Sequence, residues 1–481
     1  MRSIDYTKNN KPFQKAIAEK YGYGRMVMYT DETKIDESNV VQELQNALSY
    51  HLGNVEAIRY LDKYYRGDQP ILYRDKQVRP EINHKVVENH ALEIVDSKVA
   101  DLYGEPIQYV LADNDDESKS KFMNQLNRYM KSEDKAALDI KRGRWASICG
   151  TSYYYVGNQN RMPKQFDEAP FFINCENPTK TFVVYYADDE TPAFAVRIRR
   201  NKDGELYYVY TQYKIFTIQN GEIISTANNG NDMIPVIEYP NNERRLSDIE
   251  ITIALTDAIN DMQSDRLNAI DQFVQAFLLF KNCAIDEKTF KELRQNGAIS
   301  VADCADGKKA DVSSLVTELS QDGSQTSKDD LYNSMLTIQG MPSRQEAAGG
   351  DTGQAVALRN GYYAEEKRAE LRIPIFQQSE RMMLRVVLNK LRVKQNSQLS
   401  ISDIDIRPNR SKLENMMVKA QVLQILHNMG VDDAIALKTV NLFSDVQDTY
   451  IKSKERLEEH FNSLISKGEE VIEVENGNTE V

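Results

Sequence analysis

The sequence lacks most of the features by which a protein's chemistry is usually recognised. Its 481 residues include only four cysteines, and no two of them form a Cys-x-x-Cys pair. This spacing supports neither a zinc ribbon nor a dithiol redox motif, so we expect reduced thiols in a cytoplasm. No apolar run approaches the about 20 residues needed to cross a bilayer, and the first residues carry no apolar signal core. We therefore expect no membrane partner.

Positive charge is also scarce. The formal net charge is −13, which argues against a protein that grips nucleic acid over a broad basic surface. It remains compatible with a protein that lets a polyanion slide past with little adhesion. Hydrophobic residues make up 41% and charged residues 28%, as in ordinary globular proteins, and the length allows several domains.

The motifs of common enzyme classes are missing as well. The sequence has no GxxxxGK[ST] loop and no GxGxxG, HExxH, GxSxG or EF-hand pattern. Asp286-Glu287-Lys288 resembles a nuclease D-x-K element, and Asp403 and Asp405 lie two apart on a predicted strand. Solvent-facing charges explain both patterns more simply, and His84 and His90 are read as ordinary surface or core residues. We expect no catalytic residue, no metal site and no cofactor.

One long stretch dominates what is present. Residues 247–281 begin with Ser-Asp-Ile-Glu, the pattern of a capping box, and no glycine or proline occurs from residue 241 to 296. At ~1.5 Å per residue such a helix would be roughly 50 Å long and needs a long partner, which a ring of identical rods supplies. One face carries apolar residues at helical spacing, namely Leu255, Ile259, Met262, Ile270, Phe273 and Phe277. The opposite face is acidic and includes Asp257, Asp261 and Asp265.

Helices are predicted before a region rich in strands. Between residues 151 and 239, runs of Tyr, Val, Ile, Phe and Thr alternate with turn signals, which predicts an antiparallel sheet laid against the helices. The clearest turns are 201–204 and 219–221, because Asp-Gly and Asn-Gly favour positive φ. The expected fold class is α+β and predominantly helical. The helices predicted before the sheet cover residues 39–53, 54–65, 83–103 and 119–149.

The second half returns to helices. A loop at 340–353 is rich in Gly and Ala, and its single basic residue is Arg344. A proline at 374 is expected to kink the long helix that follows the loop. The acidic tail, 468–481, is expected to be disordered. The helices predicted in this half cover residues 327–339, 354–395, 411–429, 432–443 and 446–467.

Several stretches, in this order, resemble the portal proteins of tailed bacteriophages, specifically the siphophage type. Each is weak alone, but five in the right order span about residues 60–280. The capping-box stretch with its following Asp-Ala-Ile-Asn and Ser-Asp is the most specific of them. The five are Tyr60–Ile71 (YLDKYYRGDQPI), Asn83–Val99 followed by Leu102–Pro106 (LYGEP), Gly150–Tyr153 (GTSY), Ile234–Asn242 (IPVIEYPNN) and Ser247–Asp265.

This resemblance implies a ring, typically of twelve copies, set at one capsid vertex of the virion and assembled in the host cytoplasm. Double-stranded DNA passes along its axis during packaging and ejection. The subunit would be built from wing, stem, clip and crown regions around a central tunnel. On that template the regions are an N-terminal arm (1–45), a wing (46–245), a stem helix (246–281), a clip (282–326), a second stem helix (327–340), a tunnel loop (341–352), a kinked tunnel and wing helix (353–395), a crown (396–467) and the acidic tail (468–481).

The resemblance also implies contacts and partners. Terminase and head-completion or adaptor proteins would dock at the clip, and major capsid and scaffold proteins would surround the ring. An acidic stem face would repel phosphates, so that DNA is not trapped. Two other classes stay open: a metal-dependent DNA-processing enzyme that travels with a phage, and a non-portal scaffold protein. The expected contact residues are Ser343, Arg344, Gln345, Asp257, Asp261 and Asp265 for DNA, and Lys308 and Lys309 for clip partners.

Overall fold

The chain forms two compact units, and three of the boundaries between them fall inside helices. The first unit contains Tyr23 and the described residues of Tyr60–Ile94 and Asp248–Arg368, and the second those of Gly24–Arg59, Val95–Ser247 and Ala369–Val481. The three helices are α3 (Val40–Tyr65), α4 (His90–Tyr103) and α11 (Tyr362–Gln395). The computed structural model describes residues 23–77, 79–112, 117–158, 169–230, 232–274, 277–281, 291, 311–315, 321–342, 362–395, 397–408, 416–440, 449–450 and 453–456.

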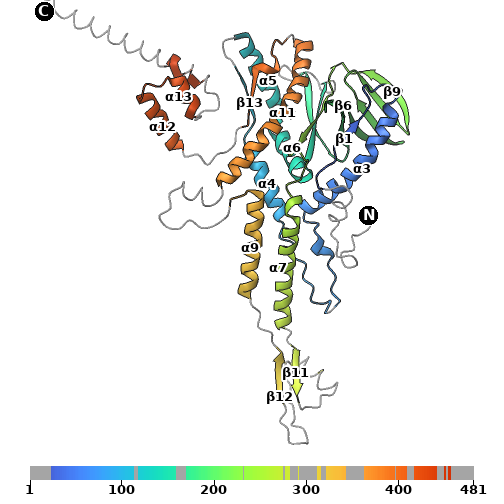
Figure 1. Cartoon of the computed structure of the whole chain (residues 1–481), viewed down its shortest axis with the longest axis vertical. Helices are drawn as coiled ribbons and strands as arrows, with labels where there is room; N and C mark the ends of the chain where they lie inside the picture. Colours follow the sequence, from blue (N-terminus) through green and yellow to red (C-terminus); the bar gives the residue numbers. More distant parts are fainter. Residues whose placement is uncertain are drawn as a thin grey trace, which may run out of the picture. The chain divides into compact units, whose positions relative to one another are not determined.

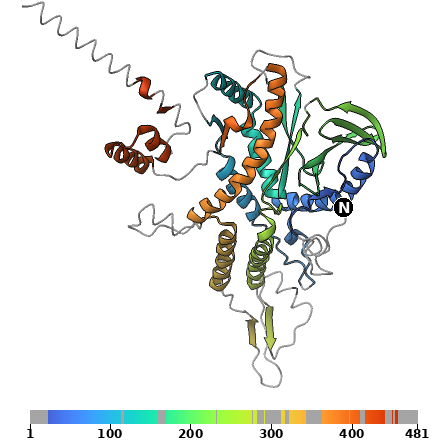
Figure 2. The same cartoon turned by 45° about the horizontal axis from the view of Figure 1, so that its top comes forward.

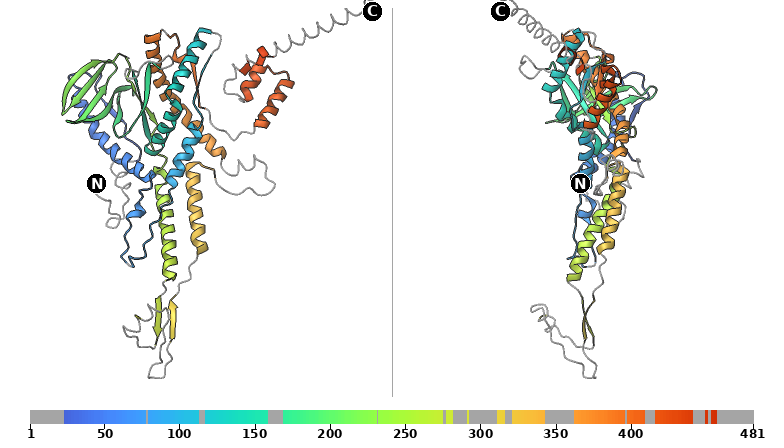
Figure 3. Two further views of the ribbon diagram at one scale, coloured as in Figure 1. Left: turned by 180° about the vertical axis from the view of Figure 1, so that it is seen from behind. Right: turned by 90° about the vertical axis from the view of Figure 1, so that its left-hand side faces the viewer.

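Two helices that run side by side form the first unit (Figures 1 and 3). They are α7 (Ile253–Val274) and α9 (Gln321–Gln339), and a two-stranded antiparallel sheet of β11 (Phe277–Lys281) and β12 (Asp311–Leu315) follows at one end. Short 3-10 turns, η1 (Pro70–Tyr73) and η2 (Glu250–Thr252), complete the unit.

The expected helix over 247–281 is therefore too long at both ends. Ser247 lies before η2, and its buried hydroxyl donates to the carbonyl of Ser147. At the other end, the apolar run Phe277–Phe280 has no helical periodicity, and its backbone pairs with β12 instead. A short apolar run is ambiguous between helix and strand until its pairing partner is known.

Two separate sheets, rather than the single sheet expected, organise the second unit. One has six strands in the order β1-β5-β6-β7-β8-β9, and the other three in the order β10-β3-β4. The predicted hairpin turns are confirmed between β6 and β7 and between β8 and β9, with positive φ at Gly204, Asn220 and Gly221. The six strands are β1 (Met28–Thr30), β5 (Thr181–Tyr186), β6 (Pro192–Asn201), β7 (Gly204–Tyr210), β8 (Lys214–Gln219) and β9 (Glu222–Asn228). The three are β3 (Thr151–Asn158), β4 (Phe171–Glu176) and β10 (Val236–Pro240).

Each of these sheets is covered by helices. The six-stranded sheet curves over the N-terminal part of α3, whose Val40, Leu44 and Ala47 share a core with Phe182 and Phe194 (Figure 2). The three-stranded sheet packs in one large core with α5 (Glu117–Ser132), α6 (Lys135–Cys149), α11 and the small sheet of β2 (Gln108–Leu111) and β13 (Ile404–Arg407).

Local breaks divide or join several predicted helices. Residues 39–53 and 54–65 form the single helix α3, whereas 119–149 is split in two because Asp134 adopts a left-handed conformation with φ of 51°. Helix α11 continues through Pro374. Helices α12 (Met416–Asn428) and α13 (Asp433–Val440) pack against each other, and the acidic tail lies outside the described residues. In the part of the chain that is described, no helix is both long and apolar enough to cross a membrane.

Candidate functional site

The acidic side of α7 is the only predicted contact region that falls within the described residues. Ser343, Arg344 and Gln345, expected at the tunnel loop, lie outside them, as do Lys308 and Lys309 and the Asp286–Lys288 pattern. The structure therefore leaves those predictions as they stand. It describes Asp257, Asp261 and Asp265 in detail.

Asp257 does not face solvent freely. Its carboxylate accepts the hydroxyl of Tyr64 at 2.8 Å, and Tyr64 is completely buried. Burial raises the pKa of Asp257 to about 7; the Tyr64 hydrogen bond opposes this rise, and the neighbouring Asp261 adds to it. Asp257 thus holds the end of α3 within the first unit.

Asp261 and Asp265 remain on the surface but share one cation. The Arg74 guanidinium lies 3.4 Å from Asp261 and 3.0 Å from Asp265, and the two carboxylates are 58% and 62% exposed. Burial raises the pKa of Asp261, an effect that Arg74 counteracts. These two residues, and not Asp257, present charge to solvent on this side of α7. A DNA contact at any of the three remains a prediction.

A row of uncharged polar residues covers the centre of the same face. Asn260, Ser264 and Asn268 are all buried, and each accepts a backbone N–H from the extended segment 83–89. The donors are Glu88 to Asn260 at 2.8 Å, Val86 to Ser264 at 3.0 Å and His84 to Asn268 at 2.7 Å.

These three hydrogen bonds can form in a row because the repeat of the helix along its axis is close to the repeat of an extended segment. Four helical residues rise about 6 Å, and two extended residues span about 6.6 Å, so every fourth side chain of α7 meets every second N–H of the segment. This contact corrects the predicted helix 83–103, because α4 begins only at His90. The N–H groups that a longer helix would have used are bound by α7 instead. The spacing of Asn260, Ser264 and Asn268 was the available sequence signal.

Replacing Ser264 by alanine should release the centre of this contact. The buried N–H of Val86 would lose its acceptor, which costs about 1–3 kcal/mol. We expect amide hydrogen exchange in peptides covering residues 84–89 to accelerate about ten-fold or more. The matched control is Ser334→Ala on α9, whose residue is exposed, and it should leave this exchange unchanged. Unchanged exchange in Ser264→Ala would contradict the hydrogen bond.

Most of the described side-chain contacts of helix α9 lie along one side. Its Gln339 amide donates to the Asp248 carbonyl at 2.5 Å and to Thr252, and its Met335 and Leu336 pack with Ile94. Lys328, the single cation in the α9 sequence, pairs with Glu88 at 2.6 Å.

The opposite side of α9 is acidic and open. Asp322, Asp329 and Asp330 are exposed, and the exposed hydroxyl residues Thr326 and Ser327 lie between the first and second of them. The helix's only cation, Lys328, is already paired with Glu88. Such a surface repels phosphates.

Two buried charged clusters in the second unit were not identified from the sequence. In one, Glu238 accepts both Nε and Nη2 of Arg245 at 2.8 and 2.9 Å, together with the hydroxyls of Tyr185 and Thr151. Burial pushes the pKa of Glu238 up, but Arg245 outweighs it, so this pKa lies below its usual value. The sequence signal that could have indicated this cluster was the carboxylate of Glu238 within the otherwise apolar strand β10.

The other cluster joins α6 to α11. Lys135 lies 2.6 Å from Asp139 and 2.9 Å from Glu380, and Glu380 also accepts the hydroxyls of Tyr109 and Tyr239. The Arg142 guanidinium stacks over aromatic rings, 4.4 Å from the centroid of Tyr239. These charges are paired and shielded from solvent, which fits a structural role.

The residues considered as metal ligands in the sequence have other partners in the structure. Asp403 ends a 3-10 turn, accepts the N–H of Ser400 and pairs with Lys119 at 3.0 Å, whereas Asp405 pairs with Arg407. His84 contacts Asp271, and His90 contacts Glu88 and Glu93. Within the described ranges, no group of three His, Cys, Asp or Glu residues is arranged to hold a metal ion.

Comparisons with known proteins cover most of the chain. A family model described as "Phage portal protein, SPP1 Gp6-like" matches residues 47–462. No curated protein matches at a significant level. One solved structure with a similar chain is "Virion of native gene transfer agent (GTA) particle", with a TM-score of 0.41, 12% identity and coverage of 73% of this chain and 89% of that chain. Another is "Neck of empty GTA particle computed with C6 symmetry", with a TM-score of 0.44, 10% identity and coverage of 73% and 90%.

Proposed function

Because the chain belongs to the SPP1 Gp6-like family of phage portal proteins, we propose that twelve copies form a ring whose channel conducts double-stranded DNA during packaging and ejection. The protein is a portal protein, and its family is structural rather than enzymatic. The ring stands at one vertex of the capsid. Its assembly takes place in the host cytoplasm, with major capsid and scaffold proteins around it.

The regions of the subunit follow from this role. Helices α7 and α9 form the stem, and β11 and β12 lead into the clip, where terminase and head-completion proteins dock near Lys308 and Lys309. Residues 341–352 form the tunnel loop, with Ser343, Arg344 and Gln345 touching DNA. Helix α11 leads from that loop into the wing, residues 46–245, and the crown comprises residues 396–467.

The exposed acidic side of α9 is the observation that supports a channel wall best. Much of the polar side of α7 is occupied by residues 83–89, so it cannot all face a water-filled tunnel. On α9, by contrast, Asp322, Asp329 and Asp330 are open to solvent. Repeated around a ring, these carboxylates repel the phosphate backbone and keep the duplex from adhering. Asp261 and Asp265 add to the same field.

Reversing the charge of this wall tests the proposal. A variant with Asp322, Asp329 and Asp330 all replaced by lysine should still form rings in electron micrographs, because these side chains are exposed. It should package DNA about ten-fold less efficiently, since basic rings retain phosphates. The same residues replaced by asparagine should have a smaller effect.

The matched control changes an equal charge elsewhere. Asp188, Asp189 and Glu190 form the exposed turn between β5 and β6, and their replacement by lysine should leave packaging near its normal level. Normal packaging by the α9 lysine variant would contradict the assignment of α9 to the channel wall. Purified protein that forms no rings would refute the channel itself.

A further inference from the structure

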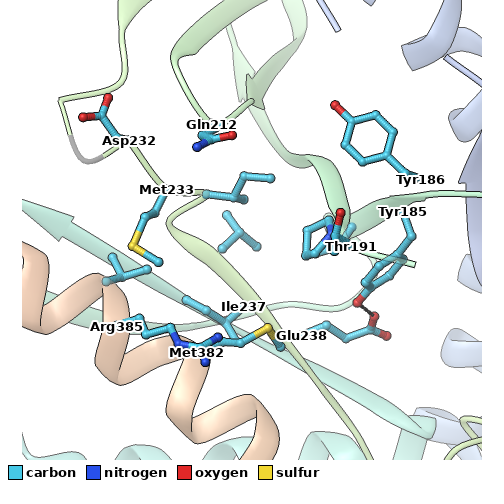
Figure 4. A pocket seen from close by; sticks show the side chains of 15 residues that line it. Tyr185, Tyr186, Thr191, Gln212, Asp232, Met233, Ile237, Glu238, Met382 and Arg385 are labelled. Atoms are coloured by element: carbon cyan, nitrogen blue, oxygen red, sulfur yellow. Dashed lines mark hydrogen bonds between the residues drawn. The ribbon is translucent and has the colours of Figure 1, made fainter. Parts of the chain in front are cut away.

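The second unit contains a cavity of about 310 Å³ between its two sheets and α11 (Figure 4). This volume lies at the lower end of the range typical of ligand pockets. The wall is mainly apolar and includes Val183, Ile234, Val236, Ile237, Met382 and Val386. The space is therefore suited to one or two aliphatic side chains.

The polar groups around the cavity differ between its sides. Glu238 and Tyr185, at the inner end, are bonded to each other and to the Arg245 network. Figure 4 shows Arg385 with Met382 of α11 on one side, and Asp232 with Gln212 from the loops on the other. An anionic ligand is favoured next to α11 and disfavoured next to Asp232.

Arg385 belongs to a row of arginines on the open side of α11. Arg381, Arg385 and Arg392 are all exposed, and their spacings of four and seven residues place them on one helical face. None of the three has a hydrogen bond or ion pair with any described residue. Three neighbouring guanidinium groups that pair with no described residue form a local positive surface in a chain of net charge −13, and such a surface favours an anionic partner.

We propose that this arginine row and cavity bind residues 469–475 of the chain itself, Glu-Glu-Val-Ile-Glu-Val-Glu. In an extended segment, Ile472 and Val474 share one side and enter the cavity, and Glu470 on that same side reaches Arg385 or Arg381. The last described residue is Arg456, and the 16 residues from there to Ile472 can span about 50 Å. The segment comes either from the same copy or from a neighbouring one.

The cavity is what favours a peptide over nucleic acid. DNA would offer phosphates to the arginines but has no aliphatic side chain to fill the apolar space. Segment 469–475 offers both, because its four glutamates are interleaved with three aliphatic residues. The inference does not depend on the channel, since the two sites use different elements.

A binding titration tests the proposal on the full-length chain. A receptor variant with Glu469, Glu470, Glu473 and Glu475 replaced by glutamine, and Ile472 and Val474 by serine, lacks the charges and aliphatic side chains of its own segment. A labelled peptide of residues 466–481 can therefore be titrated against it by fluorescence anisotropy. Adding Arg381→Glu and Arg385→Glu should weaken the peptide about ten-fold or more. A peptide with lysine at the four glutamate positions should bind this arginine-to-glutamate receptor more tightly than the natural peptide does.

The control receptor carries Arg128→Glu and Arg200→Glu instead. Both residues are exposed arginines of the same unit, and peptide binding should stay within about two-fold of the unmodified value. Equal losses in both receptors, or no binding by the natural peptide, would overturn the proposal. A short DNA duplex that binds where the peptide does not, and is lost in Arg381→Glu/Arg385→Glu, would also overturn it and assign the row to nucleic acid.

Discussion

Alanine in place of Gly150 should lower the free energy of unfolding by roughly 2–5 kcal/mol. Gly150 ends α6 with φ of 83°, and its N–H donates to the carbonyl of Ala146. A Cβ at this position would lie 1.9 Å from the carbonyl oxygen of Arg245, a backbone atom that cannot rotate away. The substitution thus combines the cost of a left-handed alanine with displacement of the turn at Arg245, which also accepts the N–H of Arg25.

Trp145 makes the measurement direct. It is the only tryptophan in the chain, lies in α6 and packs against the core of the second unit, so its fluorescence in urea follows this region. Gly430→Ala is the control, because Gly430 has a similar φ of 78° but no atom within 4 Å of an added Cβ. It should cost only about 1–2 kcal/mol. An equal decrease in the free energy of unfolding in the two variants would show that the contact with Arg245 does not contribute to the cost.

Replacing Glu380 by glutamine should destabilise the second unit by about 3–5 kcal/mol. The buried cluster is neutral as it stands, with Lys135 and Arg142 facing Asp139 and Glu380. Glutamine keeps the shape of the side chain but leaves one positive charge uncompensated. The pKa of Glu380 is consistent with a charged carboxylate: burial raises it, but Lys135 and the tyrosine hydrogen bonds outweigh burial and hold it below the usual value.

A second substitution separates charge from packing. Lys135→Met together with Glu380→Gln restores neutrality, so the double variant should be more stable than the sum of the single losses predicts. Glu222→Gln on the exposed strand β9 should leave the urea midpoint unchanged. A fully additive double variant would show that the Lys135–Glu380 pair contributes no coupling energy.

Elements governed by local backbone chemistry were predictable from the sequence. The Asp-Gly and Asn-Gly turns formed the expected hairpins because few other residues accept positive φ there. The small residues from Gly150 to Ser152 marked the start of β3, where the backbone of residue 245 passes too close for a side chain. The family resemblance, drawn from short stretches in a fixed order, is confirmed.

Features that depend on a distant partner were not predictable. Residues 83–89 have a helical pattern of side chains, yet their N–H groups bind α7, nearly 180 residues later. The strand identity of Phe277–Lys281 depends on Asp311–Leu315, and the division of the strands into two sheets depends on which edges meet. Glu380 has no partner nearby in sequence to indicate that it is buried.

The candidate site divides in the same way. By itself, the sequence determined that a long acidic helix exists, that its polar residues share one side, and that the chain is a portal protein. Only the tertiary structure decided that much of this side is covered, that Asp257 is held by Tyr64, and that α9 carries a further open acidic surface. The physical reason is that periodicity reports which residues share a face, whereas exposure depends on what packs against that face.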